Sequence, residues 1–252
     1  MQEPSLSIKM SPIHCSHSFQ EPILLLISEI FHSPQGEGQW IGVPSIFIRT
    51  SGCNLRCWFC DTPYASWRPE GDPVSLDALI QAVAEADVRH VVLTGGEPLL
   101  PKESVRLCAM LRERGYHITI ETAGTIDRDI ACDLMSISPK FRTSTPDAKA
   151  HPRWSALHEQ RRMPIETMHN LIRQSGDYQI KFVVDNKSDF DELQAIVEQL
   201  DVPADKVWVM PQGINEDDLD QAATWLRPWT TEQGYRYCDR MQIRWYGNRR
   251  GT

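Results

Sequence analysis

Strand-length apolar runs alternate with helical patterns along most of this chain, and this alternation limits its fold more than any other feature. The predicted strands, each short and rich in Val and Ile, are 45–49, 90–94, 118–121, 134–138, 179–184, 206–210 and 241–246. Helical patterns lie between them at 75–87, capped by Ser75, at 103–114, stopped by Gly115, and at 165–174, 188–199 and 216–230. Such an alternation predicts an α/β fold with a parallel sheet and right-handed crossovers.

Reactive residues follow the ends of several predicted strands. Three cysteines come after 45–49, and Gly95, Gly96 and Glu97 come after 90–94. The ends of later strands are followed by Thr122, Lys140 and Gln212. Because the carboxyl ends of parallel strands meet at one edge, we expect these residues to share an active site.

Composition excludes several classes of protein. The 252 residues carry a net charge of −8, which disfavours sequence-independent nucleic-acid binding. No run of about 18 uncharged apolar residues occurs, so no membrane span is expected. Residues 1–22 lack the basic start and apolar core of a signal peptide, and we expect a flexible extension and a cytoplasmic protein. The polar, Pro-punctuated segment 142–164 is interpreted as an insertion in the domain formed by 23–252.

Three of the seven cysteines form a C-x3-C-x2-C array, made by Cys53, Cys57 and Cys60. Three thiolates this close can bind one four-iron cluster and leave one iron without a cysteine ligand. A structural zinc site usually has four ligands in two pairs, and no fourth Cys or His lies nearby. Zinc binding and unligated core thiols remain the alternatives. Cys108 and Cys132 are expected to be buried small hydrophobes.

The array resembles the radical S-adenosylmethionine (SAM) superfamily, because the aromatic Phe59 precedes the third cysteine. The sequence Thr94-Gly95-Gly96-Glu97-Pro98 is similar to the superfamily's GGE motif, which cradles the methionine part of the cofactor. Glycines let the backbone approach a ligand closely, and a glutamate can accept from its ammonium group. The resemblance implies an incomplete, TIM-like (β/α)6 barrel.

From about residue 24 to its last residue, the chain resembles the 7-carboxy-7-deazaguanine synthase family. The matching elements are E-I-F-x-S-x-Q-G-E-G at 29–38, an arginine four residues before the first cysteine, Cys60-Asp61-Thr62, and the ending at 245–252. The resemblance implies a carbon–nitrogen lyase that converts 6-carboxy-5,6,7,8-tetrahydropterin to 7-carboxy-7-deazaguanine with loss of ammonia, in queuosine and 7-deazapurine biosynthesis.

Substrate and cofactor contacts are implied by the same resemblance. Those to the substrate are Pro34, Gln35, Gly36, Glu37, Arg49, Thr94 and Thr252. Polar groups at 34–37 can bind the pterin edge, and Arg49 can hold its carboxylate in a bidentate fork. Those to SAM are Phe59, Asp61, Gly96, Glu97, Ser138, Lys140 and Gln212. Thr62 is implied to bind Mg²⁺, a hard ion suited to oxygen ligands.

The implied chemistry needs no catalytic side chain beyond the [4Fe–4S] cluster and SAM. The resemblance implies that a hydrogen atom is removed from C6 of the pterin and returned before ammonia leaves. It also implies a one-electron donor such as a flavodoxin, and a homodimer. We expect no nucleic-acid or membrane partner.

Two other functions are open to a chain with this array. One is a glycyl-radical activating enzyme, which acts on a protein, although the Q-G-E-G and C-D-T elements are not expected there. The other is a zinc or iron–sulfur binding module without enzymatic activity. One departure from the family concerns Gln242, which stands where relatives often have His.

Overall fold

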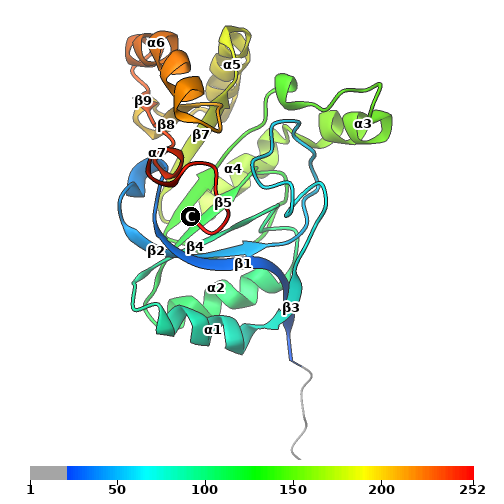
Figure 1. Ribbon diagram of the computed structural model, residues 1–252, viewed down its shortest axis with the longest axis vertical. Coiled ribbons are helices and arrows are strands. Elements are labelled where there is room, and N and C mark those ends of the chain that lie inside the picture. Colours follow the sequence, from blue (N-terminus) through cyan, green and yellow to red (C-terminus); the bar gives the residue numbers. More distant parts are fainter. Residues whose placement is uncertain (1–21) are drawn as a thin grey trace, which may run out of the picture.

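A single nine-stranded sheet organises the computed structural model, which describes residues 22–252 (Figure 1). Its order is β3-β1-β2-β4-β5-β6-β7-β8-β9. The strands are β1 (Leu24–Pro34), β2 (Pro44–Thr50), β3 (Asp72–Ser75), β4 (His90–Gly95), β5 (His117–Thr122), β6 (Leu134–Ile137), β7 (Tyr178–Val184), β8 (Val207–Pro211) and β9 (Arg236–Tyr237). The extension predicted at the N-terminus lies, up to residue 21, outside the described residues.

Neighbouring strands from β2 to β9 are all parallel, whereas β1 runs antiparallel to both β2 and β3. The helices are α1 (Leu76–Glu85), α2 (Glu103–Glu113), α3 (Pro152–Arg161), α4 (Ile165–Gln174), α5 (Phe190–Leu200), α6 (Glu216–Glu232) and α7 (Met241–Tyr246). The predicted α/β fold with a partial barrel is therefore confirmed. The fold departs from the regular alternation of strand and helix between β5 and β6, which no helix connects.

Amphipathic helices and the apolar strands form one continuous core. In α1 the buried side chains are Leu76, Leu79, Ile80 and Val83, a spacing that places them on one helix face. Ser75 caps this helix as predicted, because its Oγ accepts from the Ala78 amide at 3.2 Å. Within residues 22–252, no helix combines the length and the apolar character needed to cross a bilayer.

Five elements differ from the sequence-based expectation, one of them the short strand β9, which no pattern predicted. The prediction of a strand at 241–246 is wrong: these residues form helix α7, in which Ile243 alone is buried. A strand needs alternate side chains to face the core, and Trp245 is exposed instead. Strands β1 and β3 were not predicted, since β1 has an irregular register between Ile27 and Glu29 and β3 contains a proline. The segment interpreted as an insertion contains the helix α3.

Stability should decrease in mild acid because of His90 on β4. Its Nδ1 lies 2.8 Å from Ser45 Oγ and its Nε2 lies 2.7 Å from Thr119 Oγ1, so it links three strands. Burial, with a smaller contribution from His117, lowers the pKa of His90 from 6.5 to about 4. Below pH 6.5 the unfolded chain gains protons that the folded chain does not yet bind, so the free energy of unfolding falls from there down to about pH 4.

Thermal melting at about pH 7.5 and pH 5 measures this effect. The His90→Gln variant should show a smaller difference between the two melting temperatures than the wild type. The exposed His32 provides the control, and His32→Gln should retain the full difference. An unchanged difference in His90→Gln would contradict the assignment.

Candidate active site

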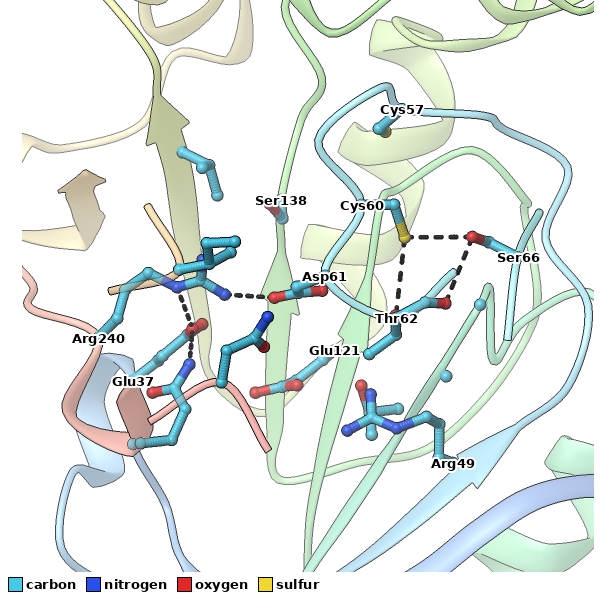
Figure 2. A pocket seen from close by; sticks show the side chains of 18 of the residues that line it. Glu37, Arg49, Cys57, Cys60, Asp61, Thr62, Ser66, Glu121, Ser138 and Arg240 are labelled. Atoms are coloured by element: carbon cyan, nitrogen blue, oxygen red, sulfur yellow. Dashed lines mark hydrogen bonds and ion pairs between the residues drawn. The ribbon is translucent and has the colours of Figure 1, made fainter. Parts of the chain in front are cut away.

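A cavity of about 790 Å³ lies at the carboxyl ends of the parallel strands. Its size is typical of sites that enclose a small molecule. Every residue predicted to bind the cluster, Mg²⁺, SAM or the substrate lines this cavity, with the single exception of Glu97. Figure 2 shows Arg49 of β2, Glu121 of β5 and Asp61 of the loop after β2 among the side chains that point into this cavity. The structure therefore brings together residues that are more than 200 positions apart in sequence.

The three cysteines of the array lie in the loop that follows β2, and none forms a disulfide. Cys60 Sγ lies 3.1 Å from Ser66 Oγ and 3.7 Å from Thr62 Oγ1 (Figure 2). Burial raises the pKa of Cys53 to about 12 and that of Cys57 to about 11. These thiols are therefore protonated at neutral pH unless a metal takes the place of the proton.

The donor set fits an iron–sulfur cluster better than one metal ion. A zinc ion needs several ligand atoms that converge on one point. Within residues 22–252, no three His, Cys, Asp or Glu side chains are grouped in that way. In a cubane cluster each cysteine binds a different iron, so the thiolates need not converge. Three unpaired cysteines around one cavity meet this requirement.

The Gly95–Gly96 turn packs directly on the cysteine loop. The Gly96 amide donates to Thr50 O at 3.1 Å, and the Glu97 amide donates to Gly52 O at 2.9 Å. A Cβ atom on Gly96 would lie 2.2 Å from Gly52 O and 2.4 Å from Ala65 O. Only glycine therefore permits this approach of two backbone segments.

Glu97 stands behind the cavity wall and is fully buried. Its carboxylate accepts from Thr122 Oγ1 at 2.7 Å, from the Leu99 amide at 3.0 Å and from the Ala123 amide at 3.0 Å. Through these three hydrogen bonds, the carboxylate holds the turn between β4 and α2 against β5. These bonds give Glu97 a structural role in that turn, and its contact with the cofactor's ammonium group stays a prediction.

Adding a methyl group at Gly96 should disturb the cysteine loop. Both atoms it would meet belong to the backbone and cannot rotate away, so overpacking of about 1–3 kcal/mol is expected. Urea unfolding of Gly96→Ala measures that loss, and iron retained per chain after anaerobic reconstitution should fall with it. Gly176→Ala is the control, because its Cβ would meet only ordinary contacts at 3.7 Å. Equal stability of the two variants would contradict the packing argument.

A network of charges, the charged wall, lines the cavity and meets the cysteine loop at Asp61. Glu37 Oε2 lies 2.6 Å from Lys181 Nζ, and Glu37 Oε1 lies 3.3 Å from Arg240 Nε and 2.6 Å from Gln242 Nε2. Arg240 also pairs with Asp61 (Figure 2). Burial alone would raise the pKa of Glu37, but Lys181 and Arg240 lower it to about 2. Glu37 is thus an ionised anchor for two cations, a role its motif did not reveal.

A second group of side chains lines the cavity where a pterin edge and carboxylate were expected. Gln35 Nε2 donates to Glu121 Oε1 at 3.1 Å, and Lys181 Nζ lies 3.7 Å from the same oxygen. Arg49 is held by Glu29, with 2.5 Å between Nε and Oε1. Its outer guanidinium nitrogens thus remain available for a carboxylate.

The C-terminal residues close the cavity and contribute Thr252 to its lining. Arg250 fastens this segment: its Nη1 lies 2.9 Å from Glu70 Oε2, and its Nη2 donates to Ser28 O at 2.9 Å. Its guanidinium also lies over the ring of Tyr64, 4.1 Å from the centroid. Elsewhere in the cavity, Lys140 donates to Ser138 O and Oγ at 2.6 and 2.7 Å.

Sequence reasoning missed four residues that shape this cavity: Glu29, Glu121, Lys181 and Arg240. A signal existed for Lys181, because a lysine inside the apolar run 179–184 has no place in a core unless it is paired. Gln242, noted only as a departure, lines the cavity and binds Glu37.

Known proteins resemble the chain in sequence and in fold. The family model described as the radical SAM superfamily matches residues 47–141. A 7-carboxy-7-deazaguanine synthase of Rhodopirellula baltica is 59% identical over 228 residues, which cover 90% of this chain and 89% of the relative. One from Halobacterium salinarum is 43% identical over 87% of this chain and 89% of its own. The crystal structure of QueE from Escherichia coli superposes with a TM-score of 0.63 at 22% identity, covering 86% of this chain and 93% of that one, and shows the shared fold.

Proposed function

The chain belongs to the 7-carboxy-7-deazaguanine synthase family of radical SAM enzymes, and we propose that its cavity converts 6-carboxy-5,6,7,8-tetrahydropterin to 7-carboxy-7-deazaguanine with loss of ammonia. The observation that carries this proposal is the convergence of the cysteine array, the Gly95–Gly96 turn and the polar residues at 34–37 on one cavity. Such an enzyme serves queuosine biosynthesis. A glycyl-radical activating enzyme is not supported, since the most similar relatives named above carry the small-molecule activity in their names.

Cys53, Cys57 and Cys60 would hold the [4Fe–4S] cluster, and the open iron would bind SAM. When bound, the reduced cluster and SAM supply the one-electron chemistry that removes a hydrogen atom from the substrate. The residues proposed to hold SAM around it are Phe59, Asp61, Gly96, Ser138, Lys140 and Gln212. The chain's own part is to position both reactants and to exclude water from the cavity.

The substrate would lie between the cysteine loop and the charged wall. Arg49 would hold its carboxylate, Gln35 would face its pterin edge together with the backbone at Pro34 and Gly36, and Thr94 would add a hydroxyl at the end of β4. Thr252 would cover it from the C-terminal segment, which Arg250 keeps closed. Glu37 would act mainly by holding Lys181 and Arg240 in place.

A magnesium ion is the third proposed cofactor, with the Thr62 hydroxyl as its protein ligand. Thr62 lines the cavity beside Cys60, and its hydroxyl is the kind of oxygen ligand that Mg²⁺ prefers. We also propose a flavodoxin-like electron donor and a homodimer, as the family resemblance implies.

Product analysis after anaerobic turnover tests this function. Cluster-loaded enzyme is incubated with SAM, Mg²⁺, dithionite and either the carboxylated tetrahydropterin or a tetrahydropterin that lacks the carboxylate. Product and ammonia should form from the carboxylated tetrahydropterin only. The Arg49→Met variant should form neither from this substrate, and should therefore no longer distinguish the two pterins. Equal consumption of both pterins would exclude the proposed role of the carboxylate.

A further inference from the structure

Arg56 belongs to the cysteine loop itself. It stands between Cys53 and Cys57 in sequence and does not line the cavity. Its side chain is buried, with 7% of the residue exposed. Nη1 donates to Cys53 O at 2.7 Å and to Leu55 O at 2.6 Å, so the guanidinium binds the loop from within.

Helix α3 packs against this arginine (Figure 1 shows α3 beside the loop that follows β2). The Arg56 guanidinium carbon lies 3.9 Å from the centroid of the Trp154 ring. The Arg56 amide donates to His158 Nδ1 at 3.2 Å, so the proton of neutral His158 is on Nε2, which faces Ser144 Oγ at 2.9 Å. His158 is fully buried. The segment interpreted as an insertion is therefore the support of the cysteine loop.

A second cation, Arg161 of α3, reaches the same loop. Its Nη1 donates to Asn54 O at 3.2 Å. The two guanidinium groups thus bind three consecutive carbonyls of the loop, those of Cys53, Asn54 and Leu55. Two like charges on one loop disfavour each other, and negative charge on the cysteines would relieve this repulsion.

Neither cation has a carboxylate partner among the described residues. No Asp or Glu oxygen of residues 22–252 lies within 4.0 Å of a nitrogen of Arg56 or Arg161. Arg56 Nε is also buried without a hydrogen-bond acceptor. The neighbouring Arg162, by contrast, pairs with both Glu159 and Glu192. A buried charge such as that of Arg56 is rarely left uncompensated, so a negatively charged group held by the cysteines would complete the charge balance of the loop.

We propose that Arg56 and Arg161 are the counter-charges of the bound iron–sulfur cluster and raise its reduction potential. The proposal rests on the proposed function, because that function supplies the anion. A cube held by three thiolates is negatively charged when reduced, and each electron gained increases that charge. Cations close to the cysteines favour the reduced state electrostatically, and the burial of Arg56 limits the screening of its charge by water. Trp154 and His158 are positioning residues that keep Arg56 in place.

Redox titration of the reconstituted enzyme, followed by electron paramagnetic resonance, tests the inference. Arg56→Gln should lower the ratio of reduced to oxidised cluster at a fixed potential by about tenfold, equivalent to about 59 mV for one electron. Arg161→Gln should shift it in the same direction by less, because Arg161 is more exposed. The Arg56→Lys variant keeps the positive charge, so its cluster should have a reduction potential close to that of the wild type.

Arg236→Gln is the matched control. That arginine also lies over a tryptophan, 5.4 Å from the Trp208 ring centroid, and its Nε donates to the carbonyl of Asp205, but it belongs to β9. Its removal should leave the potential unchanged. Unfolding curves of the apo chains and iron content per chain identify any variant that fails to fold or to load.

The outcomes are distinguishable. If Arg56→Gln and Arg161→Gln load iron and titrate at the wild-type potential, the two arginines are merely structural and the inference is wrong. If Arg56→Gln does not bind iron, the reduction potential of Arg161→Gln is the test, and a wild-type potential there shows that the inference is wrong. If the wild-type protein itself binds no cluster, the proposed function fails first.

Discussion

Replacing Cys57 with alanine should reduce product formation to the rate of the enzyme-free mixture, a loss of more than about 10³-fold. Among residues 22–252, Cys57 is one of three cysteines whose side chains line the cavity. With two thiolates left, a second iron loses its protein ligand, and the cube is no longer held with a single open position. The measurement is product formed per chain under anaerobic conditions, together with the visible absorbance of the cluster.

Cys132→Ala is the control for this variant. Cys132 is equally a free cysteine but is buried in the core, 2% exposed, as its sequence context predicted. Its loss should reduce stability slightly and leave cluster absorbance intact. Full activity of Cys57→Ala without cluster absorbance would refute the assignment of the array.

Replacing Lys181 with methionine should destabilise the apo protein by about 3–5 kcal/mol. Lys181 Nζ lies 2.6 Å from Glu37 Oε2, and the two side chains are 6% and 14% exposed. Without the lysine, the buried carboxylate loses its closest cation and must either stay poorly compensated or take up a proton. Urea unfolding at neutral pH gives the free energy of unfolding directly.

Lys206→Met provides the matched comparison, because Lys206 also pairs with an aspartate, Asp177, but at 28% and 35% exposure. A pair of that exposure contributes about 0–1 kcal/mol. The double variant Lys181→Met with Glu37→Gln should recover part of the loss, since the neutral amide no longer needs a cation. If Lys181→Met costs no more than Lys206→Met, the charged wall has no special energetic role.

The parallel sheet and the position of the cavity could be predicted because both follow from local patterns. Apolar runs such as 90–94 and 179–184 fix the strands, and the strand ends determine which loops meet. The strand predicted at 241–246 was wrong for the same reason, because it rested on local composition alone. These residues form a helix in which only Ile243 is buried. Tertiary context overrode local preference there.

Pairings between distant residues could not be predicted from patterns. Glu37 was expected to face a substrate, yet its oxygens are bound by side chains more than 140 positions later in the chain. Glu97 was expected to meet an ammonium group, and no pattern indicated that its carboxylate also accepts from Thr122 and two backbone amides. Helix α3 was not predicted because its segment is polar and contains several prolines. Its side chains contact Arg56 in the cysteine loop.

Iron analysis of the purified chain after anaerobic reconstitution tests the central claim most directly, when combined with the spectrum of the reduced cluster with and without SAM. We expect about four irons per chain and a spectrum that changes when SAM is added, because SAM would bind the iron that no cysteine holds. One zinc per chain, or a cluster whose spectrum ignores SAM, would contradict this claim.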